Sequence, residues 1–280
     1  MKIYEFCPFY KEQLIADIHI EESKKWVDEI HITEANRTFQ YLPKDFLFVN
    51  TKGAVHHKVN VDKLFKPNRK LIPNIVLNKS RSCKSIFRNP AWFNDATQRN
   101  LAASFVDFDD EDIIILSDID EIIDPVHADR IVEEVKKRKI MTVKIHFTLF
   151  YFNLFSKNWS GPADYSYRIC VIKGHEFRKK WKKDSDWLRK LGEGGKLTNE
   201  VYCPDKFMGF HHSWLGDENF ISEKLNAYAH TEHREHNDLA HIKSCLKEGK
   251  SIFPGHELEV NNSIKLLDAV EQYRRTSLFL

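Results

Sequence analysis

The sequence has no apolar run long enough to cross a membrane, since no stretch approaches the roughly 18 residues that a spanning helix requires. It also has no recognisable export signal. The first residues, MKIYEFCPFY, are too few and too polar for a signal peptide and are typical of a first β-strand. We therefore expect a cytoplasmic protein without a membrane span.

Cysteine is scarce and scattered: the chain has five, and none has the C-x-x-C spacing of zinc and redox sites. Such an odd set favours reduced thiols over a disulfide framework or a structural zinc site. An excess of one charge is also lacking, because 43 Lys and Arg nearly balance 41 Asp and Glu to a formal net charge of +2. This balance gives no reason to expect a nucleic-acid partner.

The chain does have ample material for a core, with 280 residues of which 42% are hydrophobic. Strand-like and helix-like patterns alternate along its first half, and we find no internal repeat or linker. This alternation predicts an α/β fold with a mostly parallel central sheet and helices on both faces. We expect strands at residues 2–6, 29–35, 46–49, 72–77, 113–116 and 140–146, and helices at 11–25, 94–105 (with Asn94 or Asp95 as its N-cap) and 125–139.

The most informative stretch is residues 112–124, DIIILSDIDEIID. Its four consecutive aliphatic residues have the length and β-branched content of a buried strand. Alternation along the strand puts Asp118 and Asp120 on one face, at the carboxyl edge where α/β sheets bind ligands. Clustered carboxylates there are compensated well by a hard divalent cation that also binds a diphosphate. The alternative interpretation is an acidic, solvated turn after a strand.

The alternation stops beyond residue 147. Residues 148–161 are rich in aromatics, typical of an irregular pocket wall. Residues 173–190 are basic, and two interpretations stay open: a surface that faces phosphate, an acceptor or nucleic acid, or a solvated face with two buried Trp. The glycines of residues 191–195 suit a lid over a bound donor.

A second informative stretch is residues 208–233. Asp217 and Glu218 precede an expected helix and would lie at its positive end, while Lys224 falls inside it. His230 lies near the helix end, in a series with His233 and later histidines. Because no cysteine accompanies this series, a single His that completes a site held by Asp120 is a better interpretation than a zinc site.

Together these motifs resemble glycosyltransferase family 17, the family of the N-acetylglucosaminyltransferase that adds bisecting GlcNAc to N-glycans. The resemblance runs almost from end to end, and its most specific part is residues 209–216 with Lys224 and His230. The compact form is also similar to small viral xylosyltransferases. The remaining matches are Ile3-Tyr4, Pro8-Phe9-Tyr10, Glu12, residues 34–39, Pro43-Lys44, Gln98-Arg99-Asn100, Asp118-Ile119-Asp120-Glu121-Ile122, Tyr151-Phe152-Asn153, Trp159 and Glu232.

The resemblance implies a single domain of GT-A type (Rossmann-like) over residues 1–280. Residues 1–147 would be the nucleotide-sugar-binding half, and residues 148–280 the acceptor, lid and C-terminal helical half. The implied reaction is an inverting transfer from a UDP-sugar (UDP-xylose or UDP-GlcNAc) to a hydroxyl of an oligosaccharide or glycoprotein glycan. The implied cofactor is Mn²⁺ or Mg²⁺. A viral or bacterial enzyme of glycan synthesis fits this, in the host cytoplasm if it is viral.

Roles for individual residues follow from the same resemblance. The metal is expected on Asp118 and Asp120, with His211 or His230 completing its ligands. The donor is expected to contact Glu34, Arg99, Asp118 and Lys224, with Glu34 facing the nucleoside. Inversion needs a carboxylate base that deprotonates the acceptor hydroxyl. We expect Asp217 or Glu218 in that role, while Glu193, Glu200, Asp205 and Glu232 stay open.

The chain departs from the family's pattern where Tyr41 and Asp45 replace the usual Gly and Pro, Phe210 replaces Trp, and His19 replaces a common Arg. The identity of the donor sugar is therefore not implied. Two other function classes remain. A metal-dependent phosphohydrolase or nuclease would leave the His-x-Ser-Trp stretch unexplained, and a non-catalytic carbohydrate-binding module would not need an intact D-x-D-E. Release of UDP with and without metal separates the three.

Overall fold

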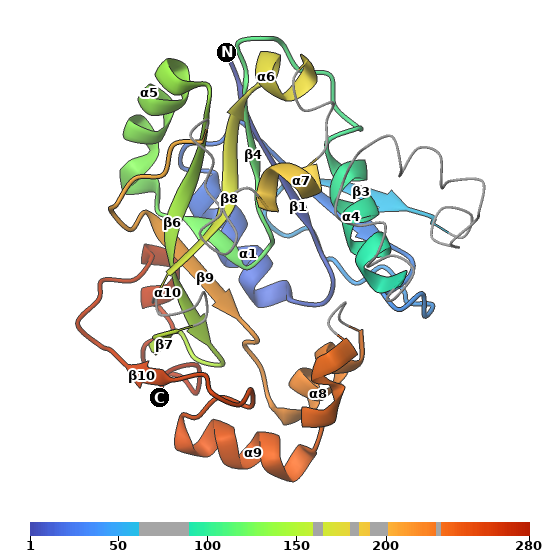
Figure 1. Ribbon diagram of the computed structural model, residues 1–280, viewed down its shortest axis with the longest axis vertical. Coiled ribbons are helices and arrows are strands. Elements are labelled where there is room, and N and C mark those ends of the chain that lie inside the picture. The colour runs from blue at the N-terminus through green and yellow to red at the C-terminus, as the bar shows by residue number, and fades with distance from the viewer. Residues whose placement is uncertain (62–89, 159–164, 180–184, 191–200, 228–230) are drawn as a thin grey trace.

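The structure is a computed structural model that describes residues 1–61, 90–158, 165–179, 185–190, 201–227 and 231–280 (Figure 1). Its strands are β1 (Ile3–Pro8), β2 (Glu29–Ala35), β3 (Val55–Val59), β4 (Ile113–Leu116), β5 (Glu121–Ile123), β6 (Ile140–Leu149), β7 (Leu154–Ser156), β8 (Tyr165–Lys173), β9 (Gly209–Ser213) and β10 (Leu258–Val260). Its α-helices are α1 (Gln13–Ser23), α4 (Pro90–Ala102), α5 (Ala128–Arg138), α6 (Gly174–Lys179), α7 (Ser185–Lys190), α8 (Glu218–Ala227), α9 (Leu239–Glu248) and α10 (Asp268–Glu271), and two 3₁₀ helices are η2 (Pro125–His127) and η4 (Thr231–His236).

The described strands form one sheet in the order β10-β7-β6-β8-β4-β1-β2-β3, and β9 pairs with β5 and β6. The strands β4, β1, β2 and β3 are parallel, as expected. From β8 onward the pairing is largely antiparallel. The sheet is therefore mixed, and the expectation of a mostly parallel sheet is wrong for this half. Only residues 150–153 separate β6 from β7, too few for the crossover that a parallel neighbour requires.

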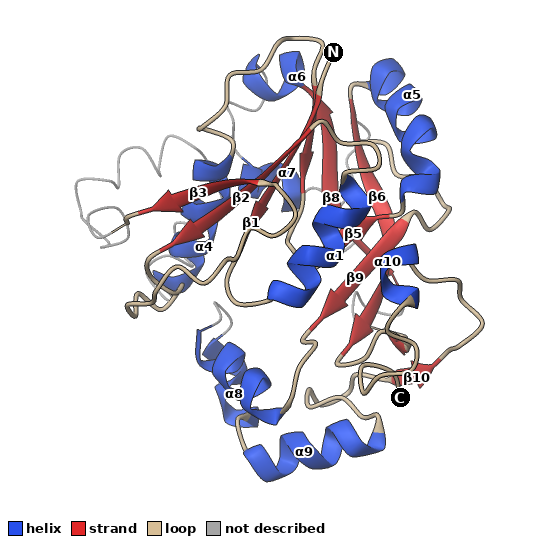
Figure 2. Cartoon of the chain, turned by 180° about the vertical axis from the view of Figure 1, so that it is seen from behind, coloured by secondary structure: helices blue, strands red, loops and turns tan. Residues whose placement is uncertain are grey.

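Alternate residues of the central strands pack into two separate cores. Ile113 and Ile115 of β4 face a core that includes residues of α1, α5 and α10. Ile114 and Leu116 face the other core, with residues of α4, α6 and α7. Figure 2 shows α1 and α10 on one side of the sheet, with α4 and α7 behind it. A strand buried on both faces needs apolar residues at every position, which explains the unbroken Ile-Ile-Ile-Leu run.

The C-terminal part adds a smaller helical layer. Helices α8 and α9 pack on each other and on the end of β6, around a core that includes Phe147, Trp214 and Ile221. In Figure 1 they lie beyond the carboxyl ends of β1 and β4, below the main sheet. None of the helices in the described part of the chain is long and apolar enough to cross a membrane.

Two expected elements differ from the structure, and a third cannot be compared with it. Residues 46–49 form no strand, because the amides of Leu47 and Phe48 donate to the Glu34 carboxylate instead of to a neighbouring strand. The helix expected at 94–105 begins at Pro90, so Asn94 and Asp95 lie inside it and do not cap it. The strand expected at 72–77 lies outside the described residues.

Candidate active site

The turn after β4 carries the acidic motif, and Glu121, the last residue of the motif, stabilises the turn. The amide of Asp118 donates to Oε2 of Glu121 at 3.0 Å, and the amide of Glu121 donates to the carbonyl of Asp118 at 3.0 Å. Glu121 is fully buried and begins β5. Its carboxylate therefore fixes the shape of the turn, while the side chains of Asp118 and Asp120 line a pocket.

Asp120 meets residues of β9 across the pocket wall. Its Oδ2 accepts a hydrogen bond from Oγ of Ser213 at 3.0 Å and lies 3.2 Å from Nε2 of His211. His211 and Ser213 share one face of β9 because side chains two residues apart on a strand point the same way. Burial by itself raises the pKa of Asp120, but His211 and Lys224 outweigh this effect and lower the pKa well below its usual range.

Glycine at position 209 lets β9 come this close. A Cβ atom at Gly209 would collide with the backbone of Ile122 in β5, which pairs with β9. The strand ends at Ser213, and the next residue, Trp214, has a φ of +62°, in the left-handed region that is costly for a bulky residue. This close pairing and this turn together place His211, Ser213 and Trp214 on the pocket.

Asp118 is neutralised by two arginines from different helices. Arg99 of α4 forms a bidentate pair with its carboxylate, and Arg189 of α7 reaches the same group and also donates to Glu121 at 2.9 Å. Burial alone would raise the pKa of Asp118, but Arg189 and Arg99 outweigh it and lower the pKa.

The pocket has a cavity volume of about 100 Å³ and opens to solvent. Acidic, basic and aromatic side chains converge on it. Its lining is Pro8, Phe9, Tyr10, Glu12, Arg37, Thr38, Phe39, Lys44, Gln98, Arg99, Asp118, Ile119, Asp120, Phe147, Arg168, His211, Ser213, Trp214, Lys224 and Ala227.

Lys224 of α8 bridges two carboxylates in this pocket. Its Nζ pairs with Glu12 and lies 3.8 Å from Oδ2 of Asp120, above the ring of Trp214 at 5.0 Å from the centroid. Burial raises the pKa of Glu12, although Lys224 opposes this effect. Lys224 thus ties α8 to the start of α1 and to the acidic turn.

The other residues with an expected site role lie elsewhere. Glu34 is fully buried and accepts from the amides of Leu47 and Phe48 and from the pocket residue Lys44 at 2.8 Å, so it holds the pocket wall from behind. Asp217 is exposed and caps α8 through the amide of Phe220, while Glu218 pairs with Lys243 at 3.3 Å. None of these three carboxylates lines the pocket. His230 lies outside the described residues.

Three residues that contact the pocket or the acidic turn were given no individual role in the sequence analysis. Ser213 was detectable, because it stands two positions after His211 on a strand and must share its face. Glu12 was among the residues that carry the family resemblance, but its sequence context gave it no role. Arg189 is one of several basic residues in segment 173–190, and no local pattern shows which of them turns inward.

Comparison with known proteins agrees with the early resemblance. A model of glycosyltransferase family 17 matches residues 1–256, and the chain belongs to this family. It is therefore a transferase that moves a glycosyl group from a donor to an acceptor. No curated protein matches the chain.

Two solved structures are similar at a low level. The crystal structure of S. aureus TarS 1-349 has a TM-score of 0.36 and 12% identity, with 86% of this chain and 70% of that chain covered. A second crystal structure of S. aureus TarS has a TM-score of 0.36 and 10% identity, with 85% of this chain and 42% of that chain covered. Likenesses this weak assign no residue a role.

Proposed function

We propose that this family 17 enzyme transfers a sugar from a UDP-sugar, with UDP-xylose and UDP-GlcNAc as candidates, to a hydroxyl of a glycan, with inversion and with Mn²⁺ or Mg²⁺. The observation that supports this most is the position of Asp120. Its ionised carboxylate lines the pocket beside His211, Ser213 and Lys224. A carboxylate and an imidazole next to several cations suit a metal-bound diphosphate better than they suit a neutral ligand.

The donor atoms of this corner fit a divalent cation. Oδ2 of Asp120 and Nε2 of His211 are 3.2 Å apart. Two neighbouring ligands at about 2.1 Å from one cation are separated by about 3 Å, so these two atoms can bind one ion together. When bound, the ion would neutralise charge on the departing diphosphate. Asp118 is a weaker ligand candidate because Arg99 and Arg189 already compensate its charge.

The basic side chains of the pocket are the proposed contacts for the phosphates. Lys224 and Arg99 were expected in this role, and Arg37, Lys44 and Arg168 also line the cavity. Charge-assisted hydrogen bonds from such groups stabilise a diphosphate leaving group as its charge grows. In this arrangement residues 1–147 supply most of the donor contacts, and residues 148–280 supply the acceptor side.

The base that activates the acceptor hydroxyl is proposed to be Asp217 or Glu218. Both belong to the start of α8, the helix that carries Lys224 into the pocket. Glu12 is a competing candidate, because it lines the pocket itself and its pKa is raised by burial. A base must lie within hydrogen-bond reach of the hydroxyl that it deprotonates, so acceptor binding decides between them.

The direct test is release of UDP from a panel of UDP-xylose, UDP-GlcNAc, UDP-glucose and UDP-galactose, with Mn²⁺ and then with EDTA. We expect one donor to be consumed, and only with metal. Metal-dependent hydrolysis of a simple phosphodiester to an alcohol and a phosphomonoester, with no donor consumed, would indicate the phosphohydrolase or nuclease instead. Glycan binding without any turnover would indicate the binding module.

A further inference from the structure

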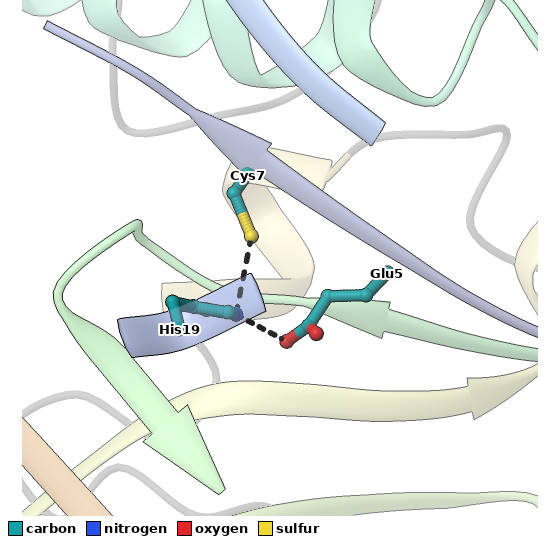
Figure 3. A group of neighbouring side chains, drawn as sticks. All are labelled: Glu5, Cys7 and His19. Atoms are coloured by element: carbon teal, nitrogen blue, oxygen red, sulfur yellow. Dashed lines mark hydrogen bonds and ion pairs between the residues drawn. The ribbon is translucent and has the colours of Figure 1, made fainter. Parts of the chain in front are cut away.

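A buried polar group lies directly behind the acidic turn. Figure 3 shows its three side chains: Glu5 and Cys7 from β1 and His19 from α1. Nε2 of His19 lies 3.0 Å from Oε1 of Glu5 and 3.7 Å from Sγ of Cys7. All three are at most 1% exposed, so none of them can contact a ligand in the pocket.

Three further contacts connect this group to the turn, and one of them joins Sγ of Cys7 to Oγ of Ser117 at 3.1 Å. Nδ1 of His19 lies 2.9 Å from the carbonyl oxygen of Ile119, the residue between Asp118 and Asp120. Oγ of Ser117, the residue just before Asp118, donates to Oε1 of Glu5 at 3.0 Å. The His19–Glu5 pair therefore holds the acidic turn at two points, one on each side of Asp118.

The direction of each hydrogen bond follows from the acceptors. A carbonyl oxygen can only accept, so Nδ1 of His19 carries a hydrogen. Nε2 faces the carboxylate of Glu5 and donates to it when the ring is protonated. Burial alone would lower the pKa of His19, but Cys7 and Glu5 outweigh this effect and raise it well above its ordinary value. Burial likewise opposes ionisation of Glu5, yet His19 and its hydrogen bonds lower the pKa of that carboxyl.

The same three side chains could also offer one atom each to a metal ion. Their burial argues against this, because a cation needs a path of access and a site that tolerates its remaining ligands. Asp120 and His211 have such a path, since they line the open pocket. A proton shared between His19 and Glu5 compensates the carboxylate without any ion.

We propose that His19 is a positioning residue: through Glu5 and the carbonyl of Ile119 it fixes the turn that presents Asp118 and Asp120 to the donor. The role of the turn in binding the donor rests on the proposed function. The rigidity that His19 gives to the turn does not. Without the imidazole, the Ile119 carbonyl and the Glu5 carboxylate are buried without their partner, and the turn gains freedom. Asp120 then loses its fixed distance to His211, and its affinity for the cation falls.

The test compares His19→Gln with His19→Arg and with Ile18→Ala. Gln keeps a donor but no charge, whereas Arg keeps a cation with separate donors for the carboxylate and the carbonyl. Ile18 is the neighbouring residue of α1, also buried but in the apolar core, so its truncation loosens the packing of α1 without removing a hydrogen bond to the turn. Cys7→Ala is a further control, because it removes the thiol and its contact with Ser117 but leaves the Glu5–His19–Ile119 chain and the hydrogen bond from Ser117 to Glu5.

The first measurement is amide hydrogen exchange of residues 117–121 in the protein without ligand. We expect exchange in His19→Gln to be about tenfold faster or more, with partial rescue in His19→Arg and little change in Ile18→Ala or Cys7→Ala. The second measurement is titration with Mn²⁺ alone, where we expect affinity to fall about tenfold in His19→Gln. Should His19→Gln not fold, Ser117→Ala removes the other tie with almost no change in volume, and it should accelerate the same amides.

Each result decides the proposal. Unchanged exchange of residues 117–121 in His19→Gln overturns it, whatever the activity of the enzyme. Equal acceleration in Ile18→Ala overturns it as well, because the effect would then be general loosening. One equivalent of tightly bound zinc that is lost with Cys7→Ala would show a metal site in place of the proton. Faster exchange in His19→Gln, in a protein whose wild type binds neither Mn²⁺ nor any UDP-sugar, would keep the positioning role and refute the proposed function.

Discussion

Asp120 and His211 face each other across two strands that are far apart in sequence. Asp120 directly precedes β5, His211 belongs to β9, and their side chains approach to 3.2 Å where these strands pair. The amide of His212 also donates to the carbonyl of Asp120 at 2.9 Å, so the backbone of β9 extends up to the acidic turn. The β5–β9 ladder thus brings the carboxylate and the imidazole together, and the contacts of His19 with the carbonyl of Ile119 help to keep Asp120 in place.

This pairing predicts the effect of Asp120→Asn. The amide is nearly isosteric and can still accept from Ser213, so we expect the fold to persist. Because the charge that would hold the cation is lost, we expect the rate of sugar transfer to fall by roughly 10²–10³-fold or more. Metal-linked binding of UDP, measured by calorimetry, should disappear with it.

Asp110→Asn, at an exposed Asp that pairs with Arg178, is the matched control and should transfer normally. Turnover of Asp120→Asn close to that of the control would refute the metal site.

Arg189 should be as important for stability as for the site. It is buried and contacts Asp118 and Glu121, so Arg189→Gln leaves two carboxylates without their main cation. We expect a loss of about 3–5 kcal/mol in the free energy of unfolding, measured by urea denaturation. The double variant with Asp118→Asn should lose less than the sum of the two single changes.

The control for Arg189 is Arg178→Gln. Arg178 also pairs with an aspartate, but on the surface, and such pairs contribute about 1 kcal/mol or less. A loss in Arg189→Gln no larger than in Arg178→Gln would show that Asp118 does not depend on this arginine.

The sequence predicts well those parts of the fold whose burial is visible as a local pattern of apolar and polar residues. The strand expected at 113–116 has the bounds of β4, because it is apolar throughout. The strand expected at 29–35 has the bounds of β2, because a clear change of pattern marks its ends. β3 was missed, since its Val-His-His-Lys-Val sequence is mostly polar and is a strand only because β2 offers it an edge. The antiparallel direction of β8 depends on chain reversal over long distance, which no local pattern records.

The site divides in the same way. Asp118 and Asp120 were expected in the site because they follow a buried strand, and His211 and Lys224 because of the family resemblance; all four line the pocket. Arg189 was not found, because its inward direction is decided by the packing of α7 against α4 and β8. Glu34 was expected to face the nucleoside, but its buried carboxylate accepts hydrogen bonds from two backbone amides and from Lys44, a residue of the pocket wall. A glutamate can thus bind a ligand or accept hydrogen bonds from backbone amides, and only the packing around it decides between these roles.

The choice of base can be tested with variants that keep the helix cap. Asn is as good an N-cap as Asp, so Asp217→Asn should leave α8 intact, whereas Asp217→Ala should cost about 1 kcal/mol of stability. If Asp217 or Glu218 is the base, Asp217→Asn or Glu218→Gln should lower kcat by about 10²–10⁴-fold without change in donor binding. Normal kcat in both, together with a large loss in Glu12→Gln, would move the base to Glu12.

The stability of the protein should fall in mild acid because of His31. This side chain of β2 is buried between Phe6 and His57, with ring centroids at 5.0 and 5.2 Å, and its Nδ1 lies 2.9 Å from Nε2 of His57. Burial, helped by His57 and opposed by Glu29, lowers the pKa of His31 from 6.5 to about 4.

The sign of the effect follows from proton binding. Between pH 6.5 and 4 the unfolded chain binds a proton at His31 and the folded chain does not, so acid favours unfolding in this window. We expect His31 to contribute a slope of up to about 1.4 kcal/mol per pH unit to the free energy of unfolding between pH 6.5 and 4. The resulting loss of stability is absent above pH 6.5 and complete near pH 4. In His31→Gln this part of the slope should vanish in urea denaturation measured across the window. Ile32→Val, a buried change without a titrating group on the same strand, should lower stability equally at every pH. If His31→Gln behaves like Ile32→Val, His31 is protonated in the folded state and its burial does not have the proposed electrostatic effect.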